Sequence, residues 1–358
     1  MLTIVERVLG AIQDTGGHSR QTRRGTGSGS AMETRVLDGT GRHVGVVGLG
    51  AWQLGGDWGT VSESDARAVL SAAVDSGVNF VDTADVYGDG RSEQLIGRFM
   101  NETRPTDLFV ATKMGRRVEQ RPEHYTAANF VEWTDRSRRN LGVGRLDLVQ
   151  LHSPPDKVFV DAGVFDALAD LVAQGRIAAY GVSVETCAQA LTAIRRYKPA
   201  SVQIILNCFR QKPLEEVLPA AREAGVGIIA RVPLASGLLS GRYDENTTFP
   251  ADDHRTYNRT GAAFDVGETF AGVPFEVGVA AVRELRAFVP EGVTMAQFAL
   301  RWIIDQPGVT TVIPGAKSST QARNNAVAAA VPALTREQID GVREVYDRLI
   351  RPHVHRRW

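Results

Sequence analysis

The sequence has little of what marks secreted, membrane or nucleic-acid-binding proteins. Its 358 residues include only two cysteines, Cys187 and Cys208, with no Cys-x-x-Cys pair and no neighbouring histidine pair. A disulfide framework and a zinc site are therefore not indicated, and a reducing cytoplasm is the expected location. No apolar run approaches the roughly 20 residues that a membrane helix needs. Lysine plus arginine equals aspartate plus glutamate, 41 each, so neither nucleic acid nor a membrane surface is indicated as a partner.

The N-terminal segment lacks an uninterrupted apolar core and a nearby cleavage site, so it does not read as a secretory signal. Residues 15–31 are rich in glycine, serine and arginine and show no periodicity. We expect residues 1–33 to form a disordered extension, with Met32 as a candidate natural start. The rest divides into a folded region, residues 34–352, and a tail, residues 353–358.

The folded region alternates strand-like and helix-like patterns. Residues 34–47 predict a hairpin, because two β-like runs flank a turn that contains glycine. Strand patterns cover residues 44–52, 79–84, 108–113, 146–152, 177–182, 201–208, 226–233 and 309–314. Helix patterns cover residues 62–77, 92–101, 126–141, 164–173, 187–197, 214–224 and 319–330. Two more helical faces carry Met295, Phe298, Ala299, Trp302 and Ile303, and then Ile339, Val342, Tyr346 and Leu349.

Eight units of a nearly continuous apolar strand followed by a helix indicate an α/β protein of the (β/α)8 or TIM-barrel class. A doubly wound sheet fits less well, because the candidate polar groups follow many successive strands rather than one switch point. Gly48-Leu49-Gly50 starts like a dinucleotide fingerprint, but Gln53 occupies the third glycine position, so we reject that interpretation. The long polar stretch 241–273 after the seventh strand is predicted to be a lid on the substrate side.

Four polar side chains follow three successive predicted strands. Asp82 ends the second strand with Tyr87 five residues later, Lys113 ends the third and His152 ends the fourth. Each alone has a structural explanation, such as a helix cap, a buried ion pair or a satisfied backbone group. A parallel barrel places the carboxyl ends of its strands on one rim, so together these residues predict a catalytic site.

The chemistry of this set suits the reduction of a carbonyl group. A lysine cation favours the phenolate and lowers the pKa of a tyrosine from about 10, so Lys113 would make Tyr87 a better general acid. Asp82 would keep Lys113 charged, and the N–H of His152 would stabilise the developing negative charge. Hydride must come from a cofactor. A metal-dependent barrel hydrolase needs more histidine and carboxylate ligands at strand ends, so no metal is expected.

The motifs that carry these residues resemble those of the aldo-keto reductase superfamily, in the same order. They are Asp82-Thr83-Ala84-Asp85-Val86-Tyr87-Gly88, Ala111-Thr112-Lys113, Leu151-His152-Ser153-Pro154 and Gly181-Val182-Ser183, and the resemblance covers about residues 35–330. It implies a catalytic tetrad of Asp82, Tyr87, Lys113 and His152, with Tyr87 as the proton donor. It also implies NADPH, bound extended across the carboxyl rim without a Rossmann domain.

The same resemblance implies individual cofactor contacts. Ser183 and Gln203 would hydrogen-bond the nicotinamide carboxamide, the segment 233–238 would cover the pyrophosphate, and Lys317 would supply a charge for a 2′-phosphate. The complete implied set is Gly50, Ala51, Trp52, Ser153, Ser183, Gln203, Arg231, Pro233, Leu234, Gly237, Leu238, Gly315, Lys317, Gln321, Asn324 and Asn325.

Several positions depart from the family pattern. Val184 stands where the family often has asparagine, and Arg231 stands near the position of an aromatic residue that stacks on the nicotinamide. Arg231 is expected either to lie over that ring or to grip the pyrophosphate. Gly315 and Gln321 occupy positions where many NADPH-preferring members have a basic residue, which leaves Lys317 nearly alone. NAD therefore stays possible as the cofactor.

On the substrate side, an apolar mouth is expected from Trp52, Trp58, Tyr87 and Phe209. The charge run 252–255 in the long loop is expected to be solvated rather than to bind substrate. His353 and His355 are expected to be inert on a frayed terminus.

The leading hypothesis is an NADPH-dependent oxidoreductase that reduces aldehydes or ketones to alcohols. The alternatives are an NAD-linked alcohol or sugar dehydrogenase of the same fold and a cofactor-binding regulatory subunit resembling potassium-channel β subunits. The expected partner is a small carbonyl compound, and the sequence carries no signal for an oligomeric state.

Overall fold

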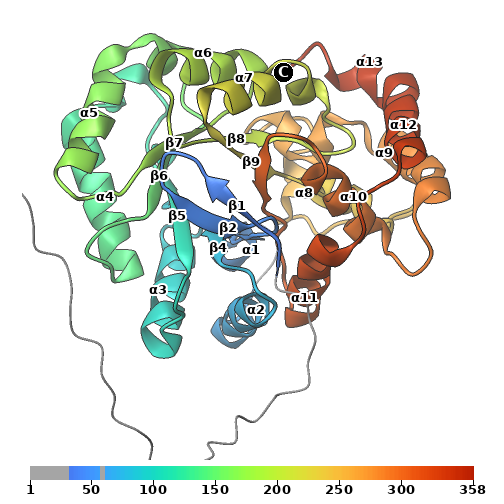
Figure 1. The fold of residues 1–358 in the computed structure, drawn as a ribbon, viewed down its shortest axis with the longest axis horizontal. Helices are drawn as coiled ribbons and strands as arrows, with labels where there is room; N and C mark the ends of the chain where they lie inside the picture. The colour runs from blue at the N-terminus through green and yellow to red at the C-terminus, as the bar shows by residue number, and fades with distance from the viewer. Residues whose placement is uncertain (1–31, 57–60) are drawn as a thin grey trace, which may run out of the picture. The chain divides into compact units, whose positions relative to one another are not determined.

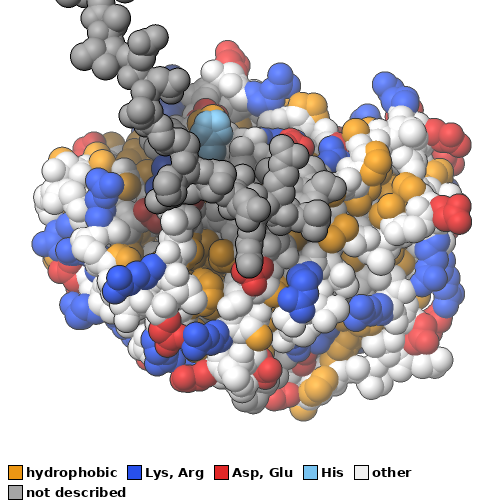
Figure 2. All heavy atoms as spheres, turned by 60° about the horizontal axis from the view of Figure 1, so that its bottom comes forward, with side chains coloured by type: hydrophobic (Ala, Val, Ile, Leu, Met, Phe, Trp, Pro, Cys, Tyr) orange, Lys and Arg blue, Asp and Glu red, His pale blue; other side chains and the backbone are white. Residues whose placement is uncertain are grey.

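The computed structural model describes residues 32–56 and 61–358. Most of the expected N-terminal extension, residues 1–31, and the predicted mouth residue Trp58 lie outside these ranges. None of the helices in the described ranges is long and apolar enough to cross a membrane. Acidic and basic side chains are interspersed over the face drawn in Figure 2.

Eight parallel strands form a closed barrel surrounded by helices (Figure 1). The strands are β3 (Leu49–Gly50), β4 (Phe80–Asp82), β5 (Phe109–Met114), β6 (Leu148–His152), β7 (Tyr180–Ser183), β8 (Ser201–Ile205), β9 (Gly227–Arg231) and β10 (Val309–Val312). Each pairs with the next in parallel, and bridges from Val47 to Val312 and from Gly50 to Gly315 close the ring. The predicted (β/α)8 barrel is confirmed, and the doubly wound alternative is wrong.

The helices mostly start and end at the predicted signals. They are α1 (Trp52–Gly55), α2 (Glu63–Asp75), α3 (Arg91–Thr103), α4 (Ala127–Leu141), α5 (Ala162–Ala173), α6 (Cys187–Tyr197), α7 (Val217–Ala224), α8 (His254–Tyr257), α9 (Phe275–Leu285), α10 (Met295–Ile304), α11 (Ser319–Val327), α12 (Arg336–Val345) and α13 (Arg351–Val354). Ser62 caps α2 by accepting a hydrogen bond from the Asp65 backbone N–H. Gly142 ends α4 in the left-handed conformation, with φ of 68°.

Some boundaries differ from the prediction. The strand expected over 201–208 ends at Ile205, because the chain then leaves the ladder and Asn207 pairs with Arg210 across a turn. Helix α9 was not predicted, although it directly follows the long segment 241–273.

The N-terminal hairpin closes the floor of the barrel. Strands β1 (Thr34–Leu37) and β2 (Arg42–Gly45) are antiparallel and lie across the centre of the barrel in Figure 1. Leu37 and Val44 pack in one apolar cluster with residues of the barrel interior, among them Phe80. With this end sealed, the opposite rim, formed by the carboxyl ends of the strands, is left for a site.

The C-terminal segment is packed, so the expectation of a frayed tail over 353–358 is wrong. Trp358 is 7% exposed, and its Nε1 donates a hydrogen bond to Asp265 Oδ1 at 3.1 Å. The Arg210 guanidinium lies 3.8 Å from the centroid of the Trp358 ring. His355 Nδ1 lies 2.8 Å from the Tyr346 hydroxyl, whereas His353 is exposed. The last residue of the chain thus contacts the segment 241–273.

Candidate active site

The structure brings the four predicted catalytic side chains together at the carboxyl rim. Lys113 Nζ lies 2.5 Å from Asp82 Oδ1, 2.8 Å from the Thr83 carbonyl oxygen and 3.4 Å from the Tyr87 hydroxyl. The His152 ring is edge-on to the Tyr87 ring, with centroids 5.8 Å apart. Strands β4, β5 and β6 supply Asp82, Lys113 and His152, as the strand-end pattern predicts.

The loop that carries Tyr87 is fixed by close backbone packing. A Cβ atom on Gly88, where φ is 60°, would lie 2.2 Å from the Gly55 carbonyl oxygen at the end of α1. A Cβ atom on Gly55 would lie 2.5 Å from the Tyr87 carbonyl carbon. Only glycine fits both positions, so Tyr87 is held against α1 while its ring faces Lys113 Nζ at 5.0 Å.

Two glutamines complete the surroundings of Asp82. Gln203 Nε2 donates to Asp82 Oδ2 at 2.8 Å, and Gln150 Nε2 donates to the same atom at 3.1 Å. Gln203, which the resemblance assigns to the nicotinamide, therefore also positions Asp82. Gln150 was missed, although it precedes His152 by two residues on β6 and so faces the same side of the strand.

The charges of the site follow from burial and from the neighbouring groups. Desolvation raises the pKa of Tyr87 above its usual value, and Lys113 lowers it by less. The predicted net lowering is therefore wrong for the protein without ligand. Although burial opposes the charge, Asp82 and Tyr87 raise the pKa of Lys113, which stays protonated. Burial, followed by Arg116 and Lys113, lowers the pKa of His152 well below its usual value, so the imidazole is neutral.

The buried carboxyl of Asp85 makes stability depend on pH. Burial and then Glu93 raise the pKa of Asp85 from 3.8 to about 7. Because the pKa of Asp85 is higher in the folded state, the fold favours the protonated carboxyl. The contribution of this carboxyl to stability is complete at low pH and is lost as the pH rises through about 7. We expect the difference in the free energy of unfolding between Asp85→Asn and wild type to shift by ~2 kcal/mol in favour of the variant from about pH 5 to about pH 8. Urea unfolding at both pH values measures this, and a difference that does not change with pH would contradict it.

Arg231 lines the cavity and is paired with two carboxylates. Its Nη2 donates to Glu185 Oε2 at 2.8 Å and to the Val184 carbonyl oxygen at 3.1 Å. Its Nη1 lies 3.5 Å from Glu268 Oε1. Arg116 Nη1 also donates to Glu268 Oε1, at 3.0 Å. None of Arg116, Glu185 and Glu268 was predicted, although Arg116 lies three residues after Lys113 and Glu185 two residues after Ser183.

A cavity of about 510 Å³ opens at this rim. Its lining includes Asp82, Tyr87 and His152 of the predicted tetrad. Of the predicted cofactor residues it includes Gly50, Ala51, Trp52, Gln203, Arg231, Pro233, Leu234, Gly237, Gly315, Lys317, Gln321, Asn324 and Asn325. Ser153, Ser183 and Leu238 are buried but do not line it. Polar lining residues that were missed are Gln53, Ser240, Arg242, Tyr243, Glu268 and Thr294. Ser236, from the predicted segment 233–238, and Arg255, from the charge run, also line the cavity.

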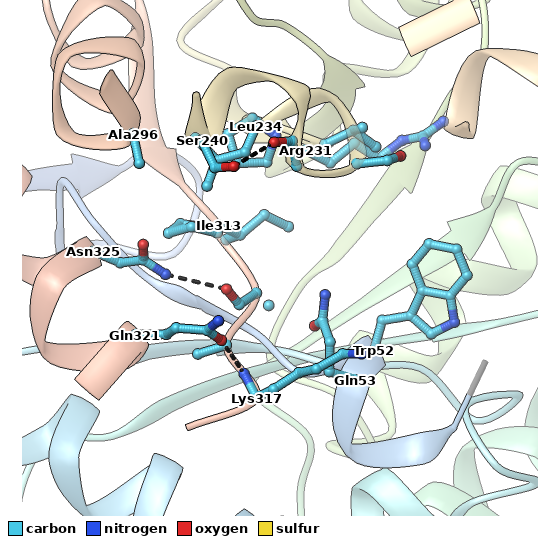
Figure 3. A pocket seen from close by; sticks show the side chains of 18 of the residues that line it. Trp52, Gln53, Arg231, Leu234, Ser240, Ala296, Ile313, Lys317, Gln321 and Asn325 are labelled. Carbon is cyan, nitrogen blue, oxygen red and sulfur yellow. Dashed lines mark hydrogen bonds between the residues drawn. The ribbon is translucent and has the colours of Figure 1, made fainter. Parts of the chain in front are cut away.

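One wall of the cavity is held in shape by side chains of α11 (Figure 3). Gln321 Oε1 accepts a hydrogen bond from the Lys317 backbone N–H at 2.7 Å. Asn325 Nδ2 donates to the Gly315 carbonyl oxygen at 3.1 Å. These two predicted cofactor residues therefore order the segment that presents Lys317. Burial, followed by Arg255, lowers the pKa of the half-buried Lys317.

The segment 241–273 supplies part of the cavity lining, including Tyr243 and Glu268, but its charge run is not solvated as expected. Asp253, His254 and Arg255 are buried, whereas Asp252 is exposed. The Arg255 guanidinium pairs with Asp253 at 2.6 Å, and the Trp52 ring lies 5.0 Å from that of His254.

Phe209 does not belong to the cavity lining, so the predicted mouth is only partly formed as expected. It is 1% exposed and lies in the core. Trp52 and Tyr87 do line the cavity, and their rings are stacked with centroids 6.1 Å apart. Within the described ranges, no group of three or more histidine, cysteine, aspartate or glutamate side chains is arranged to hold a metal ion.

Comparison with known proteins gives a consistent set of relatives. A model of the aldo/keto reductase family matches residues 46–347. Aldo-keto reductase YhdN of Bacillus subtilis (strain 168) is 30% identical over 297 residues, 81% of this chain and 86% of the relative. A probable voltage-gated potassium channel subunit beta of Arabidopsis thaliana is 28% identical over 332 residues, 88% of this chain and 96% of the relative.

A solved structure agrees with these sequence matches. The glycerol dehydrogenase AKR11B4 from Gluconobacter oxydans has a TM-score of 0.72 and 30% identity, covering 90% of this chain and 96% of that one. Fold, strand-end motifs and relatives agree over most of the chain, which is therefore a member of the aldo/keto reductase family and an oxidoreductase enzyme of that family.

Proposed function

We propose that this enzyme reduces aldehydes or ketones to alcohols, with NADPH as the hydride donor and Tyr87 as the general acid. The observation that carries the proposal is the position of Lys113, whose Nζ lies 2.5 Å from Asp82 Oδ1 and 3.4 Å from the Tyr87 hydroxyl. A cation in this position stabilises the phenolate that forms when Tyr87 gives up its proton.

The residues of the cavity fit a nicotinamide dinucleotide. Ser183 does not line the cavity, but it pairs on the sheet with Gln203, which does. Its hydroxyl is buried and has no hydrogen-bond partner among the described residues, as expected of a group that meets a carboxamide. The lining also combines the backbone of Gly50 and Gly237 with the cation of Lys317. When bound, the reduced nicotinamide supplies the hydride.

The chain's own residues supply the proton and stabilise the developing charge. The raised pKa keeps Tyr87 protonated before reaction, so its O–H can donate to the carbonyl oxygen. Neutral His152 has one N–H. Arg116 Nη1 lies 3.4 Å from His152 Nε2, and a guanidinium only donates, so Nε2 is the acceptor in that contact. A substrate oxygen at Nε2 would require the proton to move from Nδ1 to Nε2 and this long contact to be lost.

Lys317 is assigned to the 2′-phosphate that distinguishes NADPH from NADH. We expect Lys317→Met to weaken NADPH binding by about tenfold, the loss of one charge-assisted contact, and to leave NADH binding nearly unchanged. Titration with each cofactor, followed by quenching of tryptophan fluorescence, measures both affinities. Arg323→Met is the matched control, because Arg323 is exposed on α11 and bonds Ser319. Equal weakening by the two variants would contradict a specific role for Lys317.

The function itself is tested by the loss of reduced-nicotinamide absorbance in the presence of uncharged aldehydes and ketones. Carbonyl-dependent oxidation of NADPH supports the proposal. Binding of NADPH without turnover of any carbonyl in a broad panel would contradict it. We expect the enzyme to act in the cytoplasm, since Cys187 and Cys208 are both free thiols.

The relatives favour two further candidates. The resemblance to a glycerol dehydrogenase supports oxidation of an alcohol. NAD is the candidate cofactor for it, because Gly315 and Gln321 supply no basic group for a 2′-phosphate. The resemblance to a potassium-channel β subunit supports a regulatory role. Stronger binding of NADH than NADPH would favour the first, and a stable complex with a channel protein together with negligible turnover would favour the second.

A further inference from the structure

Two arginines and two glutamates form a buried cluster on the substrate side of the cavity. We call Arg116, Glu185, Arg231 and Glu268 the charge cluster. Arg116 Nη1 lies 3.0 Å from Glu268 Oε1, and Arg231 Nη1 lies 3.5 Å from the same oxygen. Arg231 Nη2 lies 2.8 Å from Glu185 Oε2. The four side chains are between 7% and 18% exposed, so water screens these charges weakly.

The charge cluster reaches the catalytic histidine through Arg116. Its Nη1, which bonds Glu268, also lies 3.4 Å from His152 Nε2. Glu268 and Arg231 line the cavity together with His152 and Tyr87, whereas Arg116 is not part of the lining. The carboxylate of Glu268 is therefore the group of the Arg116–Glu268 pair that a substrate meets.

The backbone holds Glu268 firmly in this position. Its carbonyl oxygen accepts a hydrogen bond from the Ser236 hydroxyl at 3.1 Å. Asp265 Oδ1, three residues earlier, accepts from the Gly267 backbone N–H at 2.7 Å and from Trp358 Nε1 at 3.1 Å. The segment 265–268 is thus fixed from both sides, and Glu268 is a built part of the cavity wall.

With both carboxylates ionised, the charge cluster carries no net charge, and Lys113 and Asp82 also neutralise each other. A substrate carboxylate would lose its hydration on entering this site and would meet the carboxylate of Glu268. Neither the guanidinium of Arg116 nor that of Arg231, which also lines the cavity, could compensate, because both already pair with the carboxylates of the charge cluster. An uncharged aldehyde or ketone would neither lose the hydration of a charge nor be repelled by Glu268.

We propose that Glu268 determines which substrate charge the enzyme accepts. By pairing with Arg116 at the cavity wall, Glu268 makes the enzyme select uncharged aldehydes and ketones over carbonyl compounds that bear a carboxylate, such as 2-oxo acids. This inference rests on the proposed carbonyl reductase function. The same geometry implies that removing the charge of Glu268 frees a cation beside the reacting carbonyl.

The test compares benzoylformate with its methyl ester, which carries the same ketone without the charge. For Glu268→Gln, which keeps the size of the side chain, we expect the ratio of kcat/KM for the acid to kcat/KM for the ester to rise at least about tenfold over wild type. The gain should lie mainly in a lower KM for the acid. An unchanged ratio would overturn the proposal.

Two further variants separate this effect from a general change of charge. Glu245→Gln removes one negative charge from the same long segment, but Glu245 is 52% exposed and pairs with Arg283. It should leave the ratio unchanged, and an equal gain would overturn the proposal. Arg116→Gln combined with Glu268→Gln removes both members of the pair, so the ratio of kcat/KM for the acid to kcat/KM for the ester should stay near its wild-type value. A gain by this double variant equal to that of Glu268→Gln would overturn the proposal.

A binding measurement keeps this inference separate from the proposed function. Isothermal titration with benzoylformate in the presence of NADP measures affinity without turnover. If wild type and Glu268→Gln reduce no carbonyl compound of the broad panel, the proposed function fails. Tighter binding of the acid by Glu268→Gln than by wild type would still support the role of Glu268, and equal binding would contradict it.

Discussion

Replacing Tyr87 with phenylalanine is expected to lower kcat for carbonyl reduction by roughly 10²–10⁴-fold and to leave NADPH affinity unchanged. The change removes one oxygen atom and keeps the ring that stacks with Trp52. Lys113 Nζ keeps its bonds to Asp82 and to the Thr83 carbonyl oxygen, so the site should stay assembled. What is lost is the O–H that protonates the developing alkoxide.

Single-turnover kinetics with bound NADPH measure this loss at the chemical step. Tyr180→Phe is the matched control, because Tyr180 lies at the amino end of β7, away from the rim. Near-normal turnover of the Tyr87→Phe variant would rule out Tyr87 as the acid. In wild type, activity should decline only in strongly alkaline buffer, since desolvation raises the pKa of Tyr87 above its usual value.

The fold and the tetrad were predictable because both rest on a simple periodic rule. Apolar strands separated by helices indicate the barrel, and a barrel gathers residues that follow its strands. Asp82 and His152 end their strands and Lys113 is the last but one residue of β5, so their meeting needs no knowledge of side-chain packing. The same kind of rule could have predicted Gln150, because alternate residues of a strand share a face.

The charge cluster could not be predicted, because its members meet only in the folded chain. Glu268 lies 152 positions from Arg116 and follows no strand. Its place depends on the packing of Trp358 against Asp265, a contact between the last residue and the long segment. Nothing in the local sequence distinguishes Glu268 from a solvated glutamate.

The prediction that the charge run 252–255 is solvated was wrong for a related reason. Local composition favours solvent for four charged or polar residues in succession. In the fold, Arg255 pairs with Asp253, and His254 packs against Trp52. Burial was possible because the charges are paired within the run. A hydropathy scale that scores each residue by itself does not include such pairing.

Replacing Lys113 with methionine is expected to lower the free energy of unfolding by about 3–5 kcal/mol and to abolish most activity. Lys113 is 1% exposed and Asp82 is 2% exposed, so the change leaves a carboxylate buried without its cation. Gln150 and Gln203 still donate hydrogen bonds to Asp82 Oδ2, but neither supplies a charge. Urea unfolding measures the loss, and Arg336→Met is the control, because that exposed arginine pairs with Asp340 on the surface of α12. The control should lose less than about 1 kcal/mol.

Combining Lys113→Met with Asp82→Asn shows whether the loss comes from the unpaired charge. The double variant removes both charges, so its loss of stability should be smaller than the sum of the two single losses. Losses that simply add would mean that the pair does not interact in the fold, which would contradict the arrangement at 2.5 Å. Activity should not recover in the double variant, because Tyr87 still lacks a cation beside its hydroxyl. Stability that returns without activity would therefore separate the two roles of Lys113, which neutralises Asp82 and stabilises the phenolate of Tyr87.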